Sequence, residues 1–249
     1  MTDIEGTLAQ VRESRVASRR RASRTFAHAN AGQSRSRHDP LHPVIIDHVV
    51  ILVSDAAETA RELRERYGLG SERGAYLPLA GTRMHTVWLE PPQYLEFHTI
   101  ENREVAATTE SGRVTLACEA AGDRMLGWGV LVDDLDAVSE RLGIAIHDYT
   151  VPHGDGTLRG WRAVSGPPHL PFFIDYPNNG DRSARMQMSY KRLRHTCSPT
   201  RFSELTISGS EGEMRDWLGP NDLPLRYVSG QRGIREARIE TAQGEVVIA

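Results

Sequence analysis

A histidine within a run of apolar residues is the clearest chemical feature of this chain. The run extends over Ile45–Leu52 and carries His48 among Val and Ile side chains. Such β-branched residues are typical of a buried strand, whose side chains alternate between its two faces. Alternation places His48 on one face with Ile46, and Asp47 on the other face with Val49. A buried imidazole needs a hydrogen-bond partner or a metal ion, so His48 is either a candidate ligand or a structural histidine.

A helix is predicted directly after this strand. Asp55 and Glu58 form a capping box, and Gly68 is placed to end the helix in a left-handed conformation. The β-branched and aromatic residues that follow predict three further strands. These strands are expected at Leu77–Leu79, Met84–Leu89 and Tyr94–His98. The unit is therefore a strand, a helix and three strands.

The same order of elements recurs in the second part of the chain. Gly127–Asp134 aligns with His48–Asp55 without a gap, and a helix is predicted over Leu135–Leu142. The last strand of this copy, Phe173–Asp175, aligns with Tyr94–Glu96 at nearly the same spacing. A period shared by several elements indicates a duplicated structural unit.

A weaker third copy is predicted at the end of the chain. Ser203–Ser208 has the pattern of a strand, Ser210 and Glu213 form a second capping box, and three short strands follow. The segment before it is polar and basic and is predicted as a connection. The domains that we expect are residues 1–43, 44–177, 178–199 and 200–249.

Composition narrows the classes of protein to consider. The chain has 249 residues and a formal charge of −3, which suits a soluble globular protein. No apolar window approaches the length that a membrane span requires. Two cysteines, Cys118 and Cys197, are too few for a disulfide framework or a zinc cluster. We therefore expect reduced thiols and a cytoplasmic location.

The first 43 residues differ from the rest of the chain. They are rich in Arg and Ser and have almost no apolar periodicity, so we expect a disordered tail or an over-extended start of the reading frame. A transit peptide is the first alternative, but the acidic residues Asp3, Glu5 and Glu13 argue against it. A nucleic-acid-binding arm is the second, but Phe26 is the only aromatic residue in the segment.

The tandem units resemble the vicinal oxygen chelate superfamily, and its glyoxalase-like branch most closely. The match covers roughly residues 44–177, and the third unit is similar to the extra half-module of this branch. The resemblance implies an α+β fold in which tandem βαβββ modules form a curved mixed sheet around a cleft. It is carried by Ile46–Ile51, Tyr94–Glu96, Gly127–Val130, Val132–Leu135 and Leu170–Asp175.

The resemblance also implies a metal centre. Carried over by position, His48 and Glu96 match the ligand pair of the first module, and Asp175 matches the carboxylate of the second. The fourth position falls on Gly127, which has no side chain. A divalent metal such as Zn, Fe, Mn or Mg would act there as a Lewis acid, with Glu96 or Asp175 as the catalytic base. The alternative is that these carboxylates are only hydrogen-bonded within the sheet.

Two functions therefore stay open. The first is a metal-dependent lyase, isomerase or dioxygenase that acts on a small oxygenated molecule. The second is a metal-free protein that binds or sequesters a small molecule, for which the aromatic residues Tyr94, Trp128 and Phe173 would line the cleft. A role in protein interaction is a weaker third. We expect a small-molecule substrate or ligand as the partner. We expect the protein to bind neither a membrane nor nucleic acid, and whether it forms a homodimer is left open.

Overall fold

The structure is a computed structural model that describes residues 44–122, 124–152, 158–177 and 181–249. The predictions made for residues 1–43 lie outside this part of the chain. No helix within the described ranges is long and apolar enough to cross a bilayer.

The first half of the main sheet follows the predicted order of elements. Asp55 caps the first helix by accepting hydrogen bonds from the backbone N–H groups of Ala57 and Glu58, and Gly68 ends it with φ of 68°. The strand predicted at Leu77–Leu79 lies earlier in the structure, because a turn follows Leu77. The elements are β1 (Ile45–Leu52), α1 (Ala56–Tyr67), β2 (Glu72–Leu77), β3 (Thr82–Trp88) and β4 (Tyr94–Ile100).

The second half repeats this order after a helical insertion that the sequence analysis did not predict. Asn102 and Thr109 cap the two inserted helices with their side chains, and these helices lead into the second copy. The insertion consists of α2 (Arg103–Thr108) and α3 (Glu110–Ala120). The second copy consists of β5 (Met125–Leu131), α4 (Leu135–Leu142), β6 (His147–Pro152), β7 (Leu158–Val164) and β8 (Phe172–Asp175).

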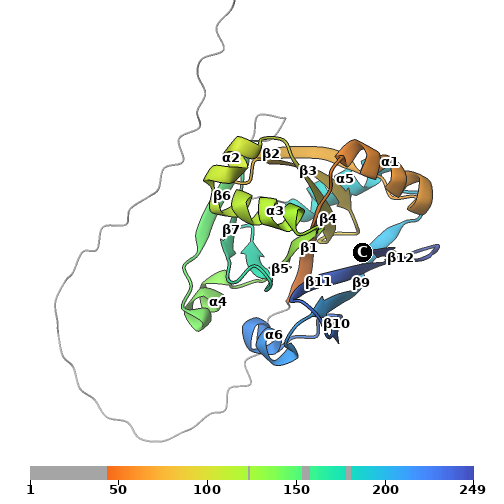
Figure 1. The fold of residues 1–249 in the computed structure, drawn as a ribbon. Helices are drawn as coiled ribbons and strands as arrows, with labels where there is room; N and C mark the ends of the chain where they lie inside the picture. Colours follow the sequence, from red (N-terminus) through yellow and green to blue (C-terminus); the bar gives the residue numbers. More distant parts are fainter. Residues whose placement is uncertain (1–43, 123, 153–157, 178–180) are drawn as a thin grey trace, which may run out of the picture. The chain divides into compact units, whose positions relative to one another are not determined.

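The two halves join into one eight-stranded sheet with the order β2-β3-β4-β1-β5-β8-β7-β6. β1 and β5 pair antiparallel at the centre, and each first strand pairs parallel with the last strand of its own half. The edge strands β2 and β6 contact each other, so the sheet curves strongly (Figure 1). This arrangement confirms the predicted fold of tandem βαβββ modules.

The rest of the chain adds a helix and a second sheet. The helix α5 lies in the segment that was predicted as a connection. The second sheet has the predicted order of elements along the chain. Its strands lie in the order β10-β9-β11-β12, so its first strand, β9, is inside the sheet, whereas β1 and β5 are the strands at which the two halves of the main sheet join. The elements are α5 (Arg182–Leu193), β9 (Pro199–Ser208), α6 (Glu211–Leu218), β10 (Leu225–Val228), β11 (Gly233–Thr241) and β12 (Gly244–Ile248).

One apolar core connects the two sheets. Trp128 and Phe173, from the main sheet, are almost fully buried there with Leu205 from the second sheet. The amide of Gln93 bridges the sheets, since its Nε2 donates to Ile46 O and its Oε1 accepts from Phe202 N, each at 2.9 Å. The core thus lies on one face of the main sheet, and the opposite face is left for other side chains.

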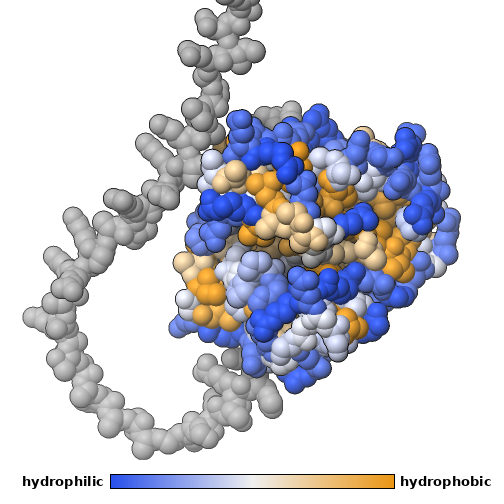
Figure 2. All heavy atoms as spheres, in the orientation of Figure 1, coloured by the Kyte–Doolittle hydropathy of each residue, from blue (hydrophilic) through white to orange (hydrophobic). Residues whose placement is uncertain are grey.

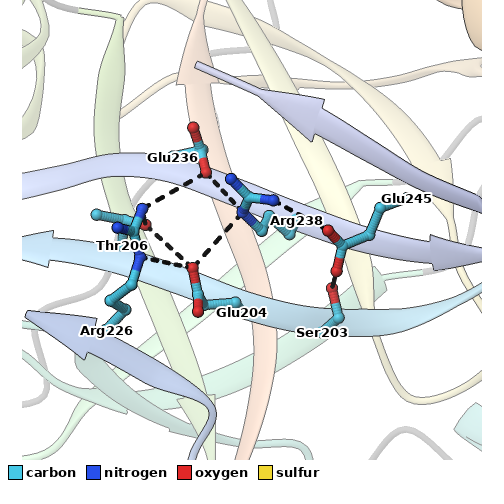
Figure 3. Close-up of polar contacts among 7 residues, drawn as sticks. All are labelled: Ser203, Glu204, Thr206, Arg226, Glu236, Arg238 and Glu245. Carbon is cyan, nitrogen blue, oxygen red and sulfur yellow. Dashed lines mark hydrogen bonds and ion pairs between the residues drawn. The ribbon is translucent and has the colours of Figure 1, made fainter.

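Charged side chains cover the solvent side of the second sheet. Arg238 donates to Glu236 at 2.7 Å and to Glu245 at 3.0 Å, and Arg226 donates to Glu204 at 2.8 Å (Figure 3). This sheet is mixed, since β10 pairs parallel with β9 and the other pairs are antiparallel, and the charged side chains form its solvated face. In Figure 2, hydrophobic residues gather in the middle of the visible face, over the region of α3 in Figure 1, and hydrophilic residues surround them.

Candidate functional site

A β-bulge in β1 creates the site. Along β1 and β5, Ile46 pairs with Val130, and the next pair joins His48 to Gly129. Asp47 is therefore an extra residue without a partner in β5. A bulge of this kind redirects the side chains next to it, which explains why neighbouring residues can meet here.

The bulge overturns one prediction about faces. Alternation placed Ile46 with His48, and Asp47 with Val49. In the structure, Ile46 lies in the core with Val49, and the side chain of Asp47 instead contacts that of His48. A one-residue insertion shifts the alternation on one side of it, and the sequence pattern gives no sign of this shift.

Asp47 is completely buried and has three polar partners. Its Oδ2 accepts hydrogen bonds from His48 Nδ1 at 2.7 Å and from the Tyr176 hydroxyl at 2.8 Å, and its Oδ1 accepts from Arg182 Nη2 at 2.7 Å. Burial alone would raise the pKa of Asp47, but the His48 hydrogen bond and the Arg182 charge outweigh it and hold the pKa below its usual range. Asp47 is therefore a carboxylate anion.

Because an ionised carboxylate only accepts hydrogen bonds, Nδ1 of His48 must carry the proton of this contact. Nε2 is then the ring nitrogen that remains to exchange a proton with a ligand, and no described residue bonds to it. The ring of Tyr94 stacks on His48 at 4.6 Å between centroids, and Phe172 lies at 5.3 Å. We call the sheet face that carries His48, Tyr94, Glu96, His98 and Phe172 the inner face.

Glu96 supplies a second carboxylate on the inner face. Its Oε2 lies 3.0 Å from His98 Nε2, and His98 Nδ1 lies 3.4 Å from the Thr82 hydroxyl. Burial raises the pKa of Glu96, but the hydrogen bond from His98 helps to lower it below its ordinary value overall. No described residue bonds to Oε1 of Glu96, so this oxygen and Nε2 of His48 are the open polar atoms.

Two tyrosines and an arginine complete the cluster. The hydroxyls of Tyr94 and Tyr176 are 3.2 Å apart, and burial raises the pKa of both. They therefore remain neutral. The guanidinium of Arg182 lies 4.0 Å from the Tyr176 ring centroid, a favourable cation–π geometry.

The structure does not bring Asp175 to this cluster. In the first half Val50 pairs with Glu96, and in the second half its counterpart Gly129 pairs with Phe172. Phe172, rather than Asp175, therefore occupies the position that corresponds to Glu96. Asp175 lies three residues after Phe172. Because side chains alternate along a strand, this odd separation turns Asp175 to the face that carries Phe173.

Asp175 instead forms an ion pair on that opposite face. Its carboxylate accepts from Arg162 Nε at 3.0 Å and Nη2 at 2.5 Å, and Arg162 also donates to Asp136 of α4 at 3.1 Å. A ligand or base role for Asp175 stays a prediction, and this geometry does not support it.

The predicted aromatic contacts fall on two sides of the sheet. Tyr94 lies on the inner face, as expected, and stacks on His48. Trp128 and Phe173 lie in the apolar core, so Phe172 is the residue of the second half that contacts the histidine. The roles of Trp128 and Phe173 in ligand binding stay predictions, and the burial of both side chains in the core does not favour such roles.

The residues present do not fit a four-ligand metal centre. Across the antiparallel pair of β1 and β5, His48 pairs with Gly129, and Val50 pairs with Gly127. The two strands hold equivalent places in their halves, so Gly127 corresponds to His48, and Gly129 corresponds to Val50. A Cβ atom at Gly127 would meet no other atom within 4 Å, so this position is open space without a ligand. Within the described ranges, no three His, Cys, Asp or Glu side chains are grouped to hold a metal ion.

Sequence reasoning missed three members of the cluster. Asp47 was assigned to the wrong face, and Tyr176 and Arg182 were not singled out. Met186 and Leu193 are the buried residues of α5, and Asp181 caps its first turn. The spacing of these two apolar residues and the capping residue before them were the signals in the sequence for a helix. Recognising that helix would have placed Arg182 in its first turn.

Comparisons with known proteins agree with this fold. A sequence profile of a family described as a glyoxalase-like domain matches residues 46–219. A crystal structure of a hypothetical protein from Staphylococcus aureus is similar, with a TM-score of 0.59 and 15% identity over 77% of this chain and 88% of that chain.

A second structural likeness is weaker. Methylmalonyl-CoA epimerase from Streptomyces coelicolor, in complex with 2-nitronate-propionyl-CoA, has a TM-score of 0.40 and 16% identity over 54% of this chain and 95% of that chain. No curated protein sequence matches. At such identities a structural likeness shows the fold alone.

Proposed function

Because the chain belongs to the family of glyoxalase-like domain proteins, we propose that the cluster around His48 is the reactive site of an enzyme for a small oxygenated molecule. The family match confirms the resemblance inferred from the sequence. A fold of this kind supports many reactions, so the proposal depends on the site itself.

The buried pair of Asp47 and His48 is the observation that carries the proposal. Asp47 fixes the ring of His48 through Nδ1 and leaves Nε2 as an oriented proton acceptor. Arg182 and Tyr176 hold Asp47 in its anionic form, so it can stabilise the imidazolium that forms when Nε2 takes a proton. The reaction that suits this arrangement is proton abstraction next to an oxygen-bearing carbon, as in an isomerase or a lyase.

A metal-dependent reaction is the second candidate. Nε2 of His48 and Oε1 of Glu96 have no bonding partner in the described residues, and such atoms are suitable ligands for Zn, Fe, Mn or Mg. A bound metal would supply Lewis-acid chemistry to a substrate oxygen. The described residues offer two such ligands rather than four.

A metal-free protein that only binds a small molecule is the third candidate. The aromatic surroundings of His48, formed by Tyr94 and Phe172, favour it. Such a protein would retain ligand affinity when His48 is replaced by a residue of similar shape, whereas an enzyme would lose its activity.

The test is a screen for incorporation of deuterium from solvent. Hydroxy acids, diketones and catechols would be incubated in deuterium oxide with wild type, His48→Ala and the control His147→Gln, an exposed histidine of β6. We expect one compound class to exchange, with a loss of about 100-fold or more in His48→Ala only. Exchange that His48→Ala retains would contradict the proposal, and exchange that a chelator abolishes would favour the metal-dependent candidate.

A further inference from the structure

A pocket adjoins the His48 cluster at the ends of β5 and β8. Its volume is about 400 Å³, large enough for a small molecule, and it is open to solvent. Tyr176 and Arg182 line this pocket and also contact Asp47. The pocket and the cluster therefore share one wall.

The two arginines of the pocket differ in how their donors are used. All three guanidinium nitrogens of Arg162 donate to carboxylates, because its Nε and Nη2 bind Asp175 and its Nη1 binds Asp136. Arg182 gives one N–H to Asp47, and its other N–H groups have no hydrogen-bond partner among the described residues. Its side chain is only 17% exposed, and the part of it that is accessible lines the pocket.

The position of Arg182 is also fixed. Its guanidinium stacks over the Tyr176 ring at 4.0 Å, and Asp47 holds one edge. A guanidinium presents a rigid fork that matches the two oxygens of a carboxylate or phosphate. A fixed fork with unused donors on a small pocket is an arrangement suited to bind such a group.

We propose that Arg182 binds the oxyanion of a small molecule, a carboxylate or a phosphate, in the pocket at the ends of β5 and β8. The ligand would then extend toward His48, a part of the inference that rests on the proposed function. The exposed carboxylate of Asp133 also lines the pocket and opposes an anion. It therefore limits the affinity, and its removal is part of the test.

The experiment uses the full chain and three probes: acetate, inorganic phosphate and the neutral isostere acetamide. Binding would be followed through the side-chain N–H resonance of Arg182 by NMR and through calorimetry. We expect saturable binding of one oxyanion and none of acetamide. Asp133→Asn should tighten this binding several-fold, because it removes a repelling charge. The preferred probe, acetate or phosphate, would identify the type of oxyanion.

Variants of Arg182 complete the test. Arg182→Gln is expected to weaken oxyanion binding about tenfold or more, and Arg185→Gln, one turn along α5 without an ion pair in the described residues, should leave it unchanged. Because Arg182→Gln leaves Asp47 without its counter-charge, the double variant with Asp47→Asn provides a folded comparison. Equal binding of acetate and acetamide, no binding of either anion, or unchanged affinity in both Arg182 variants would overturn the proposal.

The two proposals fail separately. Oxyanion binding that depends on Arg182, together with exchange activity that survives in His48→Ala, would retain the subsite and reject His48 as the base. Activity that depends on His48 without oxyanion binding at Arg182 would do the reverse.

Discussion

Asp47 and His48 are neighbours in the sequence, yet their side chains share a hydrogen bond of 2.7 Å between Oδ2 and Nδ1. In a regular strand neighbouring side chains point to opposite faces and cannot meet in this way. The bulge between Ile46 and His48 makes the contact possible. Arg182 and Tyr176 then complete the surroundings of Asp47, so the site depends on both the paired modules and helix α5.

The first prediction concerns the buried ion pair. Asp47→Asn removes the charge that faces Arg182 and should lower the free energy of unfolding by about 3–5 kcal/mol. Chemical denaturation measures this change. Adding Arg182→Gln should recover part of the loss, since the double variant has no unpaired charge. The control Asp136→Asn affects a largely exposed partner of Arg162 and should cost less than about 1 kcal/mol.

The second prediction concerns pH. The folded-state pKa values of Asp47 and Glu96 lie below their ordinary values of 3.8 and 4.5. A lowered folded-state pKa gives stability that is present above the ordinary value and is lost as the pH falls through the folded value. The free energy of unfolding should therefore fall below about pH 4.5, with a shallower fall in Glu96→Gln. A stability that stays constant down to about pH 3 would contradict this prediction.

The third prediction concerns the bridge between the two sheets. Gln93→Leu leaves the buried groups Ile46 O and Phe202 N without their partner, and it should lower the free energy of unfolding by about 2 kcal/mol or more. Gln243→Leu is the matched control, because Gln243 donates to Thr196 O at an exposed site. Equal effects of the two variants in urea denaturation would show that the bridge contributes nothing special.

The fourth prediction concerns the metal. Gly127 has open space for a side chain, and Phe172 occupies the position that corresponds to Glu96, so Gly127→His with Phe172→Glu restores two ligands. This double variant should bind zinc at least about tenfold more tightly than wild type, measured by competition with a chelator and by elemental analysis. Near-stoichiometric metal in wild type that disappears in His48→Ala would instead favour the metal-dependent candidate.

Much of the fold could be predicted from local signals. The capping residues Asp55 and Ser210 and the glycines at 68 and 143 define helix ends whose chemistry is local. The repeated pattern that begins at His48 and Gly127 identified the paired modules. These features depend on neighbouring residues and on a period, both of which a single sequence contains.

The site could be predicted only in part, because it depends on register. His48, Glu96 and Tyr94 lie together, as expected from alternation within and between adjacent strands. The alignment of Asp175 with Glu96 was displaced by three residues, since the sequence does not specify how β8 is placed against β5. An odd displacement reverses the face of every side chain, so Phe172 rather than Asp175 reaches the inner face.

The tautomer of His48 tests the central claim most directly. Nitrogen-15 NMR at about pH 9, where imidazoles are neutral, would record both ring nitrogens of His48, identified by their loss in His48→Ala. The Asp47 contact predicts a proton on Nδ1 and an unprotonated Nε2 that can accept a proton from a substrate. A proton on Nε2 in the folded protein would contradict the role of Asp47 and the proposal that His48 acts as the base.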